Sequence, residues 1–136
     1  CCQEHELYLR ALQAGLRFVF APTPHAVYRL WSEETLCRKN PRQVIEVKTA
    51  LIESLHEWMQ ARSLWTEAHQ RTAAAACFEM SRTFAKEDLA GAARYHAARR
   101  ANGLIRLDGP AAPAPYRLMY QLLGFANAER LARWLR

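Results

Sequence analysis

The strongest constraint on the fold is a long stretch of helix-type patterning that begins at Asn40 and Pro41. Asn40 can cap a helix with its side chain, and proline is favoured in a first helical turn. Behind this pair, apolar residues recur at the three- and four-residue intervals of one helix face, at Val44, Val47, Leu51, Leu55 and Trp58. The pattern predicts a helix over about 41–62, and therefore a largely helical fold.

Two more helices are expected after the first one along the chain. One begins near Thr66 and the other runs from about Glu87 to Ala101. Their apolar faces are formed by Ala76, Met80 and Phe84 and by Leu89, Ala93 and His96. Together they predict a helical hairpin, and no second copy at a fixed period indicates a repeat protein.

The residues ahead of Asn40 have a different character. Residues 4–15 alternate apolar and polar positions at near-helical spacing and end at Gly15, a natural C-terminal cap. Leu16–Phe20 and Ala26–Leu30 are rich in strand-forming residues and are separated by prolines. We therefore predict a short helix followed by two short strands.

The C-terminal segment contains a Pro/Ala-rich linker, residues 108–115, which cannot continue a helix. It leads to an amphipathic pair of short helices, 116–123 and 127–136, which we expect to dock on their own domain; a membrane-surface or partner-binding role is the alternative. The predicted fold class is mainly α: a short helix with two short strands, then a helical hairpin and tail. The predicted segments are 1–40, 41–107 and 108–136.

Composition favours an ordinary globular protein. The chain has 136 residues, about half of them apolar, and a formal net charge of +6. Its four cysteines lack metal-type spacing, so a cytoplasmic location is the simpler interpretation. No apolar run is long enough to span a bilayer. Because no Met precedes Cys1, we expect the natural protein to extend upstream.

The N-terminal residues carry a resemblance to a known family. The run Gln3-Glu4-His5-Glu6-Leu7-Tyr8-Leu9-Arg10, then Ala14-Gly15-Leu16-Arg17-Phe18 and then Tyr28-Arg29, resembles the closing segment of family 2 glycosyltransferase catalytic domains. The resemblance covers roughly the first 40 residues, which would be the C-terminal end of a GT-A type α/β domain. It implies inverting transfer of a sugar from a nucleotide-sugar donor to an acceptor hydroxyl.

The resemblance also implies roles for individual residues. Glu4 corresponds to the catalytic base, which takes the proton of the acceptor hydroxyl. Gln3, Tyr28 and Arg29 correspond to substrate-binding positions, with Arg29 near the diphosphate. Trp31 is expected to bind substrate by stacking on an acceptor sugar, and packing in the core is the alternative.

Two further residues support the site in this interpretation. Glu6 and Arg10 are spaced to pair across one helical turn. They stabilise the helix that carries the base and take no part in the chemistry.

Three positions depart from the family pattern. Gln3 replaces an acidic residue, Glu4 replaces what is more often an aspartate, and Trp31 stands where many relatives have a metal-ligating histidine. A divalent metal, Mg or Mn, is expected for the full-length enzyme, and no metal is expected to bind this fragment alone. The fragment is also expected to be inactive, because the half of the enzyme that binds the sugar nucleotide would lie upstream. No metal ligand is assigned in the chain.

The implied partners are a nucleotide sugar and a glycan or lipid-linked acceptor. Peripheral contact with the inner face of the membrane and self-association stay open. One alternative is a helical protein-interaction module without catalysis. A second is a nucleic-acid-binding domain, suggested by the positive charge, but no recognition motif supports specific binding.

Overall fold

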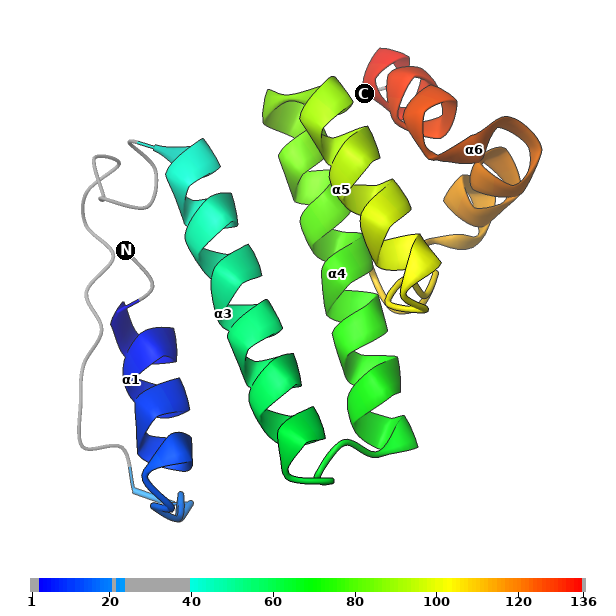
Figure 1. Cartoon of the computed structure of the whole chain (residues 1–136). Coiled ribbons are helices and arrows are strands. Elements are labelled where there is room, and N and C mark those ends of the chain that lie inside the picture. The colour runs from blue at the N-terminus through cyan, green and yellow to red at the C-terminus, as the bar shows by residue number, and fades with distance from the viewer. Residues whose placement is uncertain (1–2, 21, 24–39, 136) are drawn as a thin grey trace. The chain divides into compact units, whose positions relative to one another are not determined.

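The computed structural model describes residues 3–20, 22–23 and 40–135, and within these ranges it contains five helices and no strand (Figure 1). The helices are α1 (Gln3–Gln13), α3 (Pro41–Ala61), α4 (Glu67–Glu87), α5 (Leu89–Ala101) and α6 (Ala114–Trp134). The expectation of a mainly α fold is confirmed for these residues. The chain divides into two compact units, Cys1–Ser63 and Leu64–Arg136.

The first unit pairs α1 with α3. Leu9 is the buried residue of α1, and Ile45 is the most deeply buried residue described in α3. The backbone amide of Gln43 donates to the Asn40 side chain over 3.1 Å, which confirms the predicted N-cap. Gly15 adopts a φ of +79° just after α1, and the Leu16 amide donates to the Ala11 carbonyl, which confirms the glycine cap.

The predicted strand over 16–20 is wrong, because these residues have no regular secondary structure. A strand needs a neighbouring strand to take up its backbone hydrogen bonds, and the described residues provide none. The Phe18 ring instead packs edge-on against the Tyr8 ring of α1, with centroids 5.6 Å apart. The second predicted strand, Ala26–Leu30, lies outside the described residues.

The second unit begins with the predicted hairpin of α4 and α5. Thr66 caps α4 in a capping box with His69, and Asp88 ends α4 and caps α5 by accepting from the Gly91 amide over 2.9 Å. Only glycine fits at position 91, because a Cβ there would lie 2.8 Å from the Phe84 ring. The two helices are therefore joined by a single non-helical residue.

Helix α6 closes the core of this unit. Phe78 of α4 is fully buried, and its ring packs edge-on against Tyr116 and Tyr120 of α6, with centroids 5.9 and 6.0 Å apart. The same cluster of buried residues includes Phe125 and Ala128. The expectation that the C-terminal helices dock on their own domain is confirmed.

The Pro/Ala-rich segment before α6 is packed against α4. Ala112 is buried, and the Arg106 amide donates to the Ala74 carbonyl over 3.2 Å. Helix α6 starts at Ala114, inside the predicted linker, because proline is tolerated in a first helical turn. The segment joins two parts of one core and is not a spacer.

A break at Gly124 divides α6 into two halves, 114–123 and 125–134. Gly124 has φ 72° and ψ 172°, a region that is essentially restricted to glycine. The Asn127 side chain donates to the Leu123 carbonyl over 3.2 Å and so satisfies one of the backbone groups that the break exposes. The predicted pair of short helices is thus present as two halves of α6.

We predict that Gly124→Ala lowers the free energy of unfolding by about 1–3 kcal/mol. A Cβ at this position would meet no atom within 4 Å, so the cost is backbone strain and not a clash. Urea denaturation measures it. Gln121→Ala, an exposed helical position in the first half of α6, is the control and should change stability little. Equal stabilities of the two variants would contradict the assigned backbone conformation.

Candidate functional site

The residues predicted to carry the chemistry lie at the start of α1. Gln3 is the first residue of the helix, and Glu4 and Glu6 are in its first turn. All three side chains are exposed. Glu4 is therefore accessible to a substrate.

The Glu6–Arg10 pair forms as its spacing predicts. The two side chains meet at 2.5 Å across one turn, and both are largely exposed. An exposed pair of this kind contributes at most about 0.5 kcal/mol, so it orders the surface of α1 and does not hold the fold together. Its support of a catalytic site remains a prediction.

The other three predicted substrate-binding residues, Tyr28, Arg29 and Trp31, lie outside the described residues. The structure therefore brings Gln3, Glu4, Glu6 and Arg10 onto one helix. It does not test whether the Tyr-Arg pair lines the same cavity.

An apolar hollow lies beside this helix. It is lined by Tyr8, Leu12 and Phe18 and has a volume of about 250 Å³. Tyr8 and Leu12 follow Glu4 at successive four-residue steps, so all three positions lie along one side of α1. The hollow can receive an apolar group one turn away from a carboxylate.

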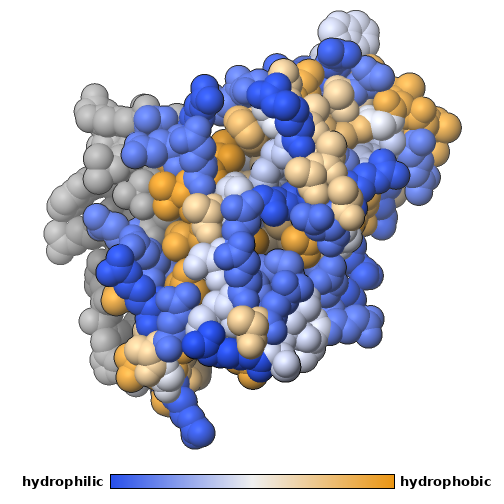
Figure 2. Space-filling model, viewed as in Figure 1, coloured by the Kyte–Doolittle hydropathy of each residue, from blue (hydrophilic) through white to orange (hydrophobic). Residues whose placement is uncertain are grey.

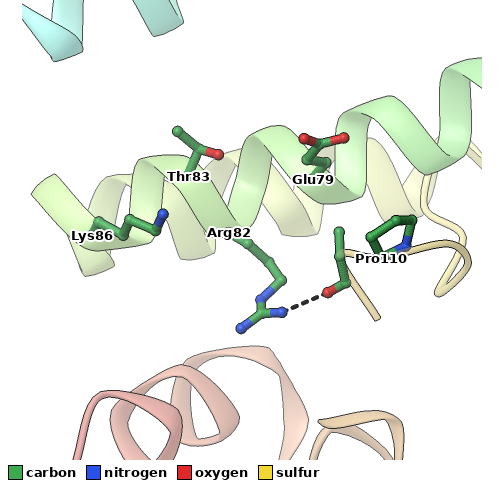
Figure 3. A pocket seen from close by; sticks show the side chains of 6 residues that line it. Glu79, Arg82, Thr83, Lys86 and Pro110 are labelled. Atoms are coloured by element: carbon green, nitrogen blue, oxygen red, sulfur yellow. Dashed lines mark hydrogen bonds between the residues drawn. The ribbon is translucent and has the colours of Figure 1, made fainter. Parts of the chain in front are cut away.

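A second hollow, of about 290 Å³, lies in the second unit between α4 and the turn before α6 (Figure 3). Its lining is formed by Glu79, Arg82, Thr83, Lys86, Pro110 and Ala111. In Figure 3 the Arg82 side chain points toward the turn that carries Pro110, whereas Glu79 and Thr83 point away from it. The lining groups thus do not converge on one point.

Arg82 is engaged inside the protein. Its Nε atom donates to Glu129 over 2.6 Å and its Nη1 atom to the Ala111 carbonyl over 2.5 Å. The guanidinium also lies 3.8 Å from the centre of the Tyr116 ring. The side chains of Arg82 and Glu129 are only 14% and 3% exposed, so this pair holds α6 on α4 and is not a ligand site.

His96 is buried among aromatic rings. It stacks on Phe125 at 4.3 Å between centroids, and its Nε2 atom shares a 3.0 Å hydrogen bond with the Tyr120 hydroxyl. Burial, and to a lesser extent the positive charge of Arg100, lowers the pKa of His96 from 6.5 to about 4. The imidazole is therefore neutral at physiological pH and belongs to the core.

The remaining buried reactive group is Cys77, which is fully buried and free. Burial raises the pKa of its thiol, so the nucleophilic thiolate is disfavoured. No group of three or more potential metal ligands occurs among the residues that the structure describes. Within the second unit, the buried polar groups therefore serve packing.

The sequence analysis did not identify Arg82, Glu129 or the role of His96. A signal was present for Arg82, because it lies at four-residue spacing from Phe78 on the face that packs inward. Glu129 gave a weaker signal as the single carboxylate of α6. Their pairing could not be read from spacing, since 47 positions separate them.

Comparisons with protein-family models, with curated proteins and with solved structures found no match to this chain.

We predict that Glu129→Leu lowers the free energy of unfolding by about 3–5 kcal/mol, because it leaves the Arg82 guanidinium buried without its carboxylate. The double variant Arg82→Met/Glu129→Leu should recover most of that loss. Chemical denaturation of the three proteins measures both effects. Glu46→Leu removes one partner of the exposed Arg42–Glu46 pair and should cost less than about 1 kcal/mol. A loss at Glu129 as small as that at Glu46 would contradict the structural role of the buried pair.

The pKa of His96 predicts a pH dependence of stability. Because the folded protein holds His96 neutral, stability is full above pH 6.5 and falls as the pH drops toward 4, by about 3 kcal/mol in total. His96→Gln cannot titrate and should remove that part of the decline in urea midpoints. His69→Gln is the control, because glutamine at this position preserves the capping box with Thr66. An unchanged decline in His96→Gln would show that His96 is not its source.

Proposed function

We propose that the chain is the C-terminal part of an inverting, nucleotide-sugar-dependent glycosyltransferase that resembles family 2, with Glu4 as the catalytic base. The observation that carries the proposal is the position of Glu4 in the exposed first turn of α1, within the motif that runs from Gln3 to Arg10. A carboxylate at this place is open to an incoming acceptor.

In the proposed reaction, Glu4 accepts the proton of an acceptor hydroxyl while that oxygen attacks the anomeric carbon of the donor sugar. The bond between the anomeric carbon and the nucleoside diphosphate breaks, and the diphosphate leaves with the electron pair. Arg29 would offset the charge that develops on the leaving group. The resemblance implies a divalent metal, Mg or Mn, in the full-length enzyme; the steps proposed here name only the roles of this chain's own residues.

The apolar hollow beside α1 supports the acceptor side of this proposal. Tyr8 and Leu12, which line it, share one side of the helix with Glu4. An acceptor that carries both a hydroxyl and an apolar portion would place the hydroxyl toward Glu4 and the apolar portion in the hollow. Of the two acceptor classes, this arrangement favours a lipid-linked one over a purely polar glycan.

We predict that Glu4→Gln lowers kcat by about a hundredfold to ten-thousandfold in the protein encoded by the complete reading frame that contains this chain. Donor KM should change little, because the base contacts the acceptor. The measurement is release of nucleoside diphosphate from a panel of nucleotide sugars in the presence of glycan and lipid-linked acceptors.

Glu67→Gln is the matched control, because Glu67 is an exposed glutamate in the first turn of α4 and its removal has the same effect on charge and helix dipole. Its kcat should equal that of the unmodified protein. An unchanged kcat in Glu4→Gln would contradict the assigned base, and absence of diphosphate release from every donor would contradict the transferase itself.

The alternative, a helical interaction module without catalysis, is favoured by one observation. Leu118 and Leu122 of α6 are exposed, and no catalytic role explains them. Removal of the chain after Asp108 is not a usable test of it, because α6 supplies Tyr116 and Phe125 to the core. Substitution of Leu118 and Leu122 by glutamine leaves the core intact, so loss of a bound partner protein in that variant is the suitable test.

A further inference from the structure

Three leucines of α6 are exposed around its break. Leu118, Leu122 and Leu123 are 58%, 74% and 45% exposed. Leu118 and Leu122 are four residues apart and therefore share one helix face, opposite the tyrosines that enter the core. In Figure 2, hydrophobic residues gather at the corner where α6 bends. We call these three residues the leucine corner; such clustering of large apolar side chains on a surface indicates an interaction site.

The exposed charges of α5 and α6 all have the same sign. Helix α5 carries Arg94, Arg99 and Arg100 and no carboxylate, and α6 carries Arg117, Arg130 and Arg133. The one carboxylate of α6, Glu129, is buried against Arg82. Of the net charge of +6, the second unit accounts for +5, with eleven cationic and six acidic residues. This surface is complementary to an anionic partner.

Two of the arginines border the leucine corner. Arg117 directly precedes Leu118 and is exposed. Arg130 donates to Asn127 over 2.9 Å, and Asn127 in turn donates to the Leu123 carbonyl. Apolar and cationic side chains therefore lie together on one region of the surface.

The chemistry of this region distinguishes between three occupants. A second copy of the chain would bring like charges together, which is unfavourable. A nucleic acid would match the charge but would leave the leucines without an apolar partner. An anionic lipid surface accepts the leucines at the boundary of its acyl chains and the arginines among its headgroups.

We propose that the leucine corner and the arginines around it form a peripheral binding site for an anionic lipid bilayer. The site is independent of the proposed catalytic role. No helix in the described ranges has both the length and the apolar character needed to cross a membrane, so α6 would lie at the interface. Both components are required, because neither three leucines nor a few arginines alone hold a protein firmly on a bilayer.

The test is co-sedimentation of the 136-residue chain with lipid vesicles. We expect binding to vesicles made of equal parts phosphatidylcholine and phosphatidylglycerol and little binding to pure phosphatidylcholine. Raising the salt concentration from about 0.05 M to about 0.5 M should weaken binding at least tenfold, because it screens the headgroup charge. Leu118→Gln/Leu122→Gln should lower the partition coefficient about tenfold or more without affecting folding, since both side chains are exposed.

Matched controls separate this site from general effects. Leu7→Gln/Leu64→Gln removes two exposed leucines elsewhere and should bind as the unmodified chain does. Arg117→Gln/Arg130→Gln should lose binding about fivefold or more, whereas the double change of the exposed Arg17 and Arg42 to Gln removes the same charge and should lose far less.

Several results would overturn the proposal. They are absence of vesicle binding, equal binding to neutral vesicles, and equal losses in a site variant and its matched control. A dimer in sedimentation velocity that Leu118→Gln/Leu122→Gln dissociates, in a chain that does not bind vesicles, would assign the corner to self-association. Tight binding of an oligonucleotide in place of vesicles, unaffected by the leucine changes, would assign the arginines to nucleic acid.

Discussion

The second unit depends on Arg82 and Glu129 being matched to each other, because either one alone would be a buried charge without a partner. Removing two charges from water is costly, and the pair is tolerated because the Ala111 carbonyl and the Tyr116 ring also contact the guanidinium. One arginine thereby joins α4, the turn before α6 and α6 itself. In the first half of α6 the tyrosines pack against Phe78, and Leu118 and Leu122 on the opposite face stay exposed.

This arrangement separates structural from functional groups. In the second unit the buried polar side chains, Arg82, Glu129 and His96, are engaged with one another or with aromatic rings. The proposed chemistry is assigned to the exposed carboxylate of α1 in the first unit. In the second unit the single carboxylate of α6 is buried in the core, so the exposed charged side chains of that helix are arginines.

Local interactions were predictable and distant ones were not. The caps at Asn40, Thr66 and Gly15 and the Glu6–Arg10 pair follow from residue types a few positions apart. The strand over 16–20 was predicted from β-propensity, which reports suitability for a pleated surface and cannot supply the missing partner strand. The pairing of Arg82 with α6 depends on which helices meet in space. For the candidate site, the sequence correctly placed Glu4 and Glu6 at a helix start, while the proposed roles rest on the family resemblance alone.

The central structural claim is that α6 belongs to the same cooperative core as α4 and α5. Native-state hydrogen exchange of the 136-residue chain, resolved by residue, tests it most directly. Because the three helices should unfold together, we expect the slowest amides of α4, α5 and the inward face of α6 to share one free energy of opening. Opening of the whole of α6 at a much lower free energy than α4 would contradict it.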